Sequence, residues 1–296
     1  MFDNNKNSKL KIKIIAVCLS LIAVGSFGYV GYKQYFEPKT KDSQYDDLRE
    51  KRQNKELSFQ NDFVDEENNK DAAHDKDDDS HEEVPESKKE SSQNKDSSSS
   101  ASADSRSSSA EQSYYTFEYT DRTFGWISIP GTSIDYPVLY LEGDNEYYLT
   151  HNYMEQYDSY GSIYLDGNQY IGAKNMTIYG HNINAYYESM FKPLVNYEDQ
   201  AFFDEHPVVE FDYGGDSSEW EVIGCMIVDL NNDHKSFNKC DFLDDNDFLD
   251  YGNTLLDNCV IKKDGFELQA DDNLLTLVTC SYHTSNCRTV VICRQI

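Results

Sequence analysis

Lysine and arginine are scarce in this chain of 296 residues, which has 26 of them against 54 aspartates and glutamates and a formal net charge of -28. Nucleic-acid binding depends on clustered cations that neutralise phosphates, so the composition argues against that class of protein. It also argues against a basic protein that lies on an anionic membrane surface. Apolar residues make up only 38% of the chain, although 14% of it is aromatic. This mixture indicates a chain built from parts of different character.

Charged residues are absent from one long stretch, residues 14–32, and four lysines precede it. About 20 apolar residues span a bilayer as a helix, and basic residues on one flank hold that flank in the cytoplasm. We therefore expect a basic cytoplasmic tail over 1–13, a single-pass cell-membrane anchor over 14–32, and an extracellular location for the rest. A cleaved signal peptide is the alternative, but the stretch is long for one and no clean small-x-small cleavage site follows it.

Aromatic residues are absent from 64–113, where serine, aspartate, glutamate, lysine and asparagine predominate. Such a composition buries too little apolar area to offset the entropy lost on ordering. The sequence therefore predicts a disordered tether over 33–113 that acts as a spacer, with a short helix possible within 45–64.

Residues 114–296 hold both tryptophans, and their 31 acidic and nine basic residues give a net charge of -22. This length is sufficient for one domain with a sizeable core. Apolar periodicity predicts a helix over 241–256. Alternating or β-branched runs predict a mostly β domain of the barrel type, with strands at 126–129, 134–140, 162–166, 176–179, 208–213, 219–230, 273–280 and 288–295.

Arginine is rare in this domain, which has only three, and Arg288 begins the apolar strand that follows Cys280. A guanidinium does not lose its proton, so Arg288 needs an anionic or polar partner. A nearby thiolate would supply one, and a nearby cation lowers the pKa of a cysteine. A thiolate nucleophile usually needs an acid–base partner, and His181 ends another predicted strand after Gly180. Cys280, Arg288 and His181 are therefore candidates for nucleophilic catalysis.

Three alternatives compete with this interpretation. A cysteine at a strand end is more often a small buried residue than a nucleophile, and Cys225, Cys287 and Cys293 could be inert core thiols. Cys240 and Cys259 flank the predicted helix and could form a disulfide in an extracellular domain. Zinc could bind the C-x2-H-x3-C spacing, although one member lies deep in a strand; its ligands would be Cys280, His283, Cys287 and Cys293.

Several motifs together resemble the sortases, the membrane-anchored cysteine transpeptidases of Gram-positive bacteria. Leu277-x-Thr279-Cys280, followed by Arg288, and Tyr179-Gly180-His181 carry this resemblance. It covers about residues 115–296 and is closest to class B, in the stretches Phe124–Ile127, Ile129–Val138, Asp144–Leu149, Gly161–Asp166 and Ser189–Leu194.

The resemblance implies an eight-stranded β-barrel with added helices, one of them before the penultimate strand. It implies that Cys280 is the nucleophile, that Arg288 stabilises the oxyanion, and that His181 is the acid and base. No metal or organic cofactor is expected. Positions matching substrate contacts are Asn145, Leu149, Tyr179 and Ser281, the last standing where some class members have an acidic residue.

The expected substrates are secreted proteins with a C-terminal sorting motif, cleaved at a threonine or similar residue. The acceptor would be an amine of the peptidoglycan precursor, or a pilin lysine in a polymerising variant. Two alternatives to a transpeptidase are a cysteine hydrolase that releases proteins and a non-catalytic anchored module that binds a surface ligand. Reactivity of the cysteine and the effect of an added amine on the products distinguish the three.

Overall fold

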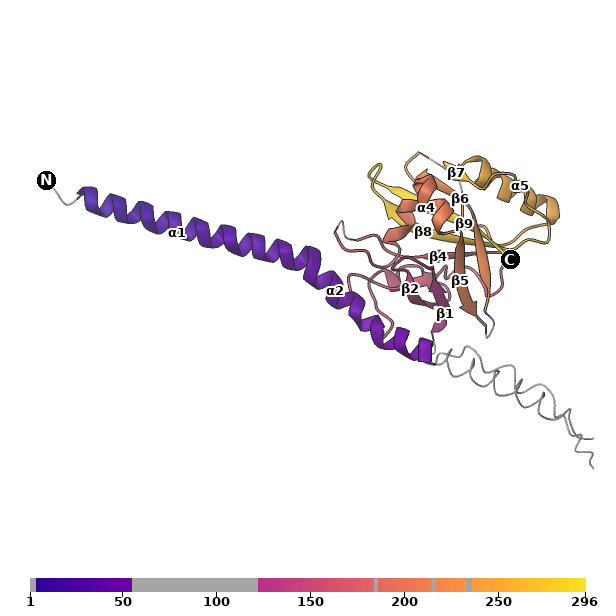
Figure 1. Ribbon diagram of the computed structural model, residues 1–296, viewed down its shortest axis with the longest axis horizontal. Coiled ribbons are helices and arrows are strands. Elements are labelled where there is room, and N and C mark those ends of the chain that lie inside the picture. Colours follow the sequence, from indigo (N-terminus) through magenta and orange to yellow (C-terminus); the bar gives the residue numbers. More distant parts are fainter. Residues whose placement is uncertain (1–3, 55–121, 184–185, 215–216, 233–235) are drawn as a thin grey trace, which may run out of the picture. The chain divides into compact units, whose positions relative to one another are not determined.

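The computed structural model describes residues 4–54, 122–183, 186–214, 217–232 and 236–296, with side chains from residue 13 onward (Figure 1). The described residues of 4–46 and 122–296 belong to one compact unit, and residues 47–54 belong to a second. Of the second unit, residues 47–54 are described and are helical, with an ion pair between Lys51 Nζ and Asp47 Oδ2.

The N-terminal helix α1 (Asn4–Gly31) continues through a π-helical turn, Tyr32–Phe36, into α2 (Glu37–Asp42) and the 3-10 turn η2 (Ser43–Tyr45). Among the described residues, the helical stretch Lys13–Asn54 includes a segment long and apolar enough to cross a membrane, with a mean hydropathy of 2.1. The length and composition of this helix fit a membrane-anchored protein.

Residues 33–45, at the start of the predicted tether, are helical in the structure and include the buried residues Pro38 and Tyr45. An aromatic ring that packs on the domain makes ordering of this segment favourable, which its polar composition concealed. Residues 46–54 are also helical, and the rest of the predicted tether lies outside the described residues.

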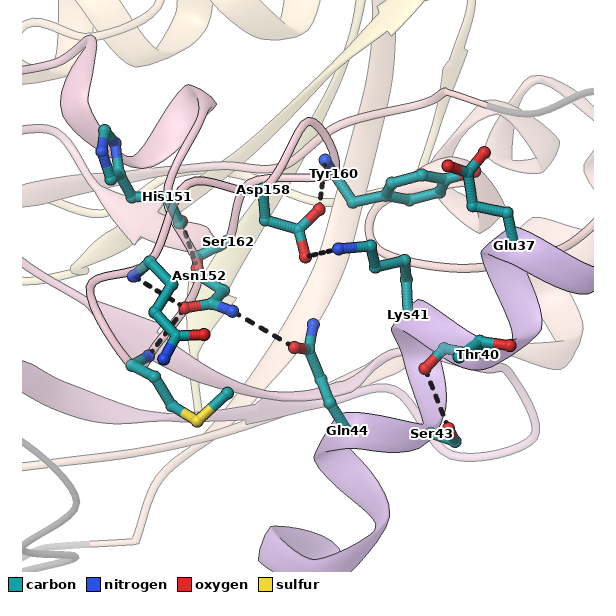
Figure 2. A network of polar contacts seen from close by, with 12 residues as sticks. Glu37, Thr40, Lys41, Ser43, Gln44, His151, Asn152, Asp158, Tyr160 and Ser162 are labelled. Atoms are coloured by element: carbon teal, nitrogen blue, oxygen red, sulfur yellow. Dashed lines mark hydrogen bonds and ion pairs between the residues drawn. The ribbon is translucent and has the colours of Figure 1, made fainter. Parts of the chain in front are cut away.

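Residues 37–45 dock on the loop that precedes β3 (Figure 2). Lys41 Nζ lies 2.8 Å from Oδ2 of Asp158, whose side chain is fully buried. Asn152 Nδ2 donates to Gln44 Oε1 at 3.3 Å. The Tyr45 ring is 1% exposed and packs edge-on against Tyr136, with 5.1 Å between the ring centroids. Both ionic and aromatic contacts therefore hold this segment against the domain.

The domain is a closed eight-stranded β-barrel, which confirms the predicted fold. The hydrogen-bonded order is β5-β1-β2-β3-β4-β8-β9-β6, and the β5–β6 pairing closes it. A ninth, two-residue strand, β7, pairs with Gly224 and Cys225 of β6, beyond the residues that pair with β5. The strands are β1 (Thr123–Ser128), β2 (Asp135–Leu139), β3 (Ile163–Leu165), β4 (Asn175–Tyr179), β5 (Val208–Tyr213), β6 (Glu219–Asp229), β7 (Ile261–Lys262), β8 (Leu274–Ser281) and β9 (Cys287–Gln295).

Short helices fill the connections: η3 (Tyr147–Leu149), η4 (Lys192–Glu198), α4 (Gln200–Glu205) and α5 (Asp245–Asp257). The predicted helix before the penultimate strand is confirmed as α5. Asp244 caps it by accepting a hydrogen bond from Asp247 N at 3.0 Å, as aspartate commonly does at this position. Its inner face buries Phe248, Leu255 and Leu256 in one cluster with Val278 of β8 and Val290 of β9. This cluster fixes the face of β8 and β9 on which the candidate residues lie.

Candidate active site

Cys280 and Arg288 form a direct cross-strand pair. β8 and β9 are antiparallel, and their register aligns Val278 with Val290 and then Cys280 with Arg288. Directly opposed residues in an antiparallel pair present their side chains on the same face. Cys280 and Arg288 are both partly exposed, next to a pair that is fully buried. The barrel therefore places a thiol and a guanidinium side by side where its apolar core ends.

Hydrogen bonds fix the segment around His181 beside Cys280. β4 runs parallel to β8, and Gly180 N donates to Val278 O at 3.1 Å. Thr279 Oγ1 donates to Gly180 O at 2.8 Å. On the other side of the histidine, Asn182 Nδ2 donates to Cys280 O at 2.9 Å. His181 thus lies between two residues that are both bonded to the β8 segment ending at Cys280.

Position 180 requires glycine on steric grounds. A Cβ atom there would lie 2.4 Å from Ile163 Cδ1 and 2.6 Å from Phe191 Cγ. Both of these side chains are buried, so neither can move aside easily. The glycine therefore lets the chain pass close to the core immediately before His181.

The His181 ring is oriented by a backbone carbonyl. Its Nε2 lies 2.9 Å from the carbonyl oxygen of Leu149. A carbonyl oxygen only accepts hydrogen bonds, so Nε2 carries the hydrogen in this contact. In the neutral ring, Nδ1 is then the nitrogen free to take a proton. Over the described part of the chain, no hydrogen bond joins the Cys280 thiol to His181 or Arg288, and such contacts often tighten only when substrate binds.

Arg288 has no carboxylate partner among the described residues. Its Nη1 donates to Cys287 O at 2.9 Å and to Asn286 Oδ1 at 3.4 Å, both neutral acceptors. Arg294, by contrast, pairs with Glu221 at 3.0 Å, and Arg122 pairs with Glu155 at 3.2 Å. The positive charge of Arg288 therefore remains available to an anion beside Cys280.

Two tyrosines, Tyr164 of β3 and Tyr179 of β4, pack against each other on the strands next to β8. Tyr164 is 4% exposed, and its ring centroid lies 5.5 Å from that of Tyr179. Burial raises the pKa of Tyr164, Asp166 and Cys280 add to the rise, and Arg288 opposes it. In the sheet, Tyr164 pairs with Tyr179, and Tyr179 pairs with Val278, two residues before Cys280. Tyr164 is not among the site residues predicted from the sequence. The only sequence feature that could have indicated it is its position in the stretch Gly161–Asp166, which resembles class B.

The four predicted substrate contacts do not share one environment. Asn145, Leu149 and Tyr179 are partly exposed, and the Leu149 carbonyl holds the catalytic candidate His181. Ser281 is 4% exposed. Because successive strand residues face opposite sides, its side chain points away from the face that carries Cys280.

The alternation of side chains along a strand also argues against the zinc site. Cys287 pairs in register with Ser281, so its Sγ is on the face opposite to Cys280, where it lies 3.0 Å from Thr284 Oγ1. The candidate ligands therefore do not converge on one point. All seven cysteines are free, so the alternative disulfide between Cys240 and Cys259 is also wrong in this structure.

Burial disfavours ionisation of three other thiols of the domain. Burial raises the pKa of Cys225 and of Cys293, and it raises the pKa of Cys259 to about 12. These groups stay protonated at neutral pH, because burial disfavours the thiolate. They are therefore poor nucleophiles.

Comparisons with known proteins identify the family of the chain. A family model described as the sortase domain matches residues 127–296. The chain is 33% identical over 159 residues to sortase B of Listeria monocytogenes, covering 53% of this chain and 61% of that relative. It thus spans less than two thirds of the length of that relative.

Solved structures of class B enzymes share the fold. Sortase B of Clostridium perfringens matches with a TM-score of 0.54 and 30% identity, covering 58% of this chain and 93% of that one. A complex of Staphylococcus aureus sortase B with substrate matches with a TM-score of 0.54 and 27% identity, covering 60% and 82%. The resemblance first found in the motifs is confirmed, and this chain belongs to the sortase family, in class B.

Proposed function

We propose that this protein is a membrane-anchored cysteine transpeptidase, in which Cys280 forms a thioester with a C-terminal sorting motif. The observation that carries the proposal is the register pair of Cys280 with Arg288, whose charge no described carboxylate neutralises. A thiolate beside an available guanidinium is suited to attack on a peptide carbonyl.

The reaction follows from the three side chains. The Cys280 thiolate attacks the carbonyl of a threonine or similar residue, and Arg288 stabilises the oxyanion that forms. His181 gives a proton to the leaving amine as the carbon–nitrogen bond breaks, and a thioester remains. An incoming amine then attacks the thioester and loses its proton to His181. The new amide leaves, and the thiolate of Cys280 is restored.

The proposed substrate is an extended peptide of a secreted protein, bound next to Asn145, Leu149 and Tyr179. The relative from Staphylococcus aureus, solved as a substrate complex, supports a bound substrate in this class. The proposed acceptor is an amine of the peptidoglycan precursor, with a pilin lysine as the variant. The basic residues before the apolar helix favour a cytoplasmic N-terminus and an extracellular catalytic domain.

The test is incubation of the purified domain with a library of internally quenched peptides, each with one fixed threonine and randomised flanking positions. We expect cleavage by the wild type, loss of cleavage in Cys280→Ala, and retention in the control Cys259→Ala. An added amine should appear in the product, which separates transfer from hydrolysis. Cleavage by Cys280→Ala at the wild-type rate would contradict the assignment of Cys280 as the nucleophile.

A further inference from the structure

Asp166 is a fully buried carboxylate that follows β3 and joins four segments of the chain. Its Oδ1 accepts from Asn145 Nδ2 at 2.6 Å and from Asn168 N at 3.0 Å. Its Oδ2 accepts from the Tyr179 hydroxyl at 3.0 Å and from Asn238 Nδ2 at 3.1 Å. These partners come from the loop after β2, the turn after β3, the end of β4 and the loop after β6.

The carboxylate is held by neutral donors alone among the described residues. Burial opposes ionisation, but the hydrogen bonds from Asn145, Asn168, Asn238 and Tyr179 outweigh it and lower the pKa of Asp166. A buried charge without a cation is costly unless every lone pair is satisfied. An apolar residue would close this part of the barrel at lower cost, so the charge points to a role beyond packing.

Two of the donors are the proposed substrate contacts Asn145 and Tyr179. A carboxylate has no hydrogen to give, so it forces each neighbour to act as a donor. Asn145 must turn its Nδ2 toward Asp166, and its Oδ1 then accepts from Gly167 N. The Tyr179 hydroxyl must also point its hydrogen inward, which fixes the ring that packs on Tyr164; in the sheet, Tyr179 pairs with Val278 of β8.

We propose that Asp166 is a positioning residue that orients Asn145 and Tyr179 toward the sorting-motif peptide. It acts on peptide binding through these two side chains and takes no part in bond making. The proposal rests on the proposed function, because it names how that same site holds its substrate. A side chain that offers a donor in place of Asp166 would turn at least one of the two away.

Asp166→Asn tests the proposal, since it keeps the shape and replaces one acceptor by a donor. We expect KM for the best peptide of the threonine library to rise about tenfold, with kcat within about threefold of the wild type. The rate of Cys280 alkylation by iodoacetamide should not change. Both a positioning and a merely structural role allow a lower thermal midpoint, but only a positioning role raises KM while kcat stays close to the wild type.

Asp158→Asn is the matched control, because Asp158 is equally buried and accepts from Tyr160 N and Lys41 Nζ away from these contacts. It should lose thermal stability and keep the wild-type KM. Asn238→Ala is a second variant: Asn238 is exposed, so its removal does not threaten folding, and we expect KM to rise about threefold.

A wild-type KM in Asn238→Ala and in folded Asp166→Asn would overturn the proposal, as would a loss of kcat alone. If Asp166→Asn does not fold, Asn238→Ala decides. A wild-type enzyme that cleaves no library peptide would instead overturn the transpeptidase assignment, and this proposal with it.

Discussion

Arg288 lies directly across from Cys280 in the β8–β9 ladder, and its guanidinium contacts only neutral acceptors among the described residues. Arg294, on the same strand, is instead paired with Glu221. The arrangement leaves a positive charge where an oxyanion would form during attack by the thiol.

Loss of this charge should affect catalysis far more than stability. For Arg288→Ala we expect kcat/KM for peptide cleavage to fall about 10³-fold, since a missing oxyanion donor commonly costs about this much. Arg288→Lys should recover part of the loss, because it keeps the charge without the planar fork.

Arg294→Ala is the control, since Arg294 is also on β9 but pairs with Glu221. It should retain activity within about threefold. An Arg288→Ala enzyme within tenfold of the wild type would contradict the assigned role.

Thiol reactivity should single out Cys280 within the domain. Cys225, Cys287 and Cys293 are buried, and the pKa of Cys225 and of Cys293 is raised by that burial. We expect iodoacetamide at pH 7 to modify Cys280 in parallel with loss of activity, as measured by peptide mapping. A cleavable peptide should slow the modification. Inactivation that instead follows the labelling of Cys240 or Cys259 would argue against Cys280 as the nucleophile.

The free energy of unfolding of the domain should depend on pH, because Asp166 is ionised in the folded state. Burial opposes ionisation of this group, but its hydrogen bonds lower its pKa below the ordinary 3.8. The unfolded chain therefore takes up the proton first as the pH falls, so the stabilisation is present above pH 3.8 and is lost as the pH falls through the lowered value.

We accordingly expect the free-energy difference between the wild type and Asp166→Asn to be largest near pH 7 and smaller near pH 3. Urea unfolding at the two pH values measures it. An equal difference at both would show that ionisation of Asp166 does not stabilise the fold.

The docked N-terminal segment should stabilise the domain through Lys41. Lys41→Met leaves the buried Asp158 carboxylate without its cation. We expect a loss of about 1–3 kcal/mol in the free energy of unfolding, less than for a fully buried pair because Lys41 is partly exposed.

Lys39→Met is the matched control, since Lys39 is exposed on the same helix α2. It should leave stability within about 0.5 kcal/mol of the wild type. Equal urea midpoints for the Lys41 and Lys39 variants would show that the docking contact adds no stability.

The sequence predicted most of the barrel because its strands have strong local patterns. The β-branched runs of β8 and β9 were enough to place Cys280 and Arg288 at neighbouring strand ends. Their register depends on pairing, which only the structure gives. The helix α5 was also predictable, since its apolar period and its capping residue Asp244 are both local.

The missed features depend on contacts distant in sequence. Lys41 and Asp158 are 117 positions apart, so the polar sequence around Lys41 gave no sign of docking. Asp166 gathers donors from loops whose approach follows only from closure of the barrel. The helix α4 and the strand β7 were too short to produce a periodic signal.

The acyl-enzyme itself is the most direct test of the central claim. Membranes of cells that produce the full-length protein are quenched in acid, and the intact protein is analysed by mass spectrometry, followed by sequencing of any attached peptide. We predict a peptide joined through its carboxyl-terminal threonine, or a similar residue, to Cys280, released by hydroxylamine and absent from Cys280→Ala. An adduct of the same mass on Cys280→Ala, or none on a wild type that cleaves its peptide, would contradict the account.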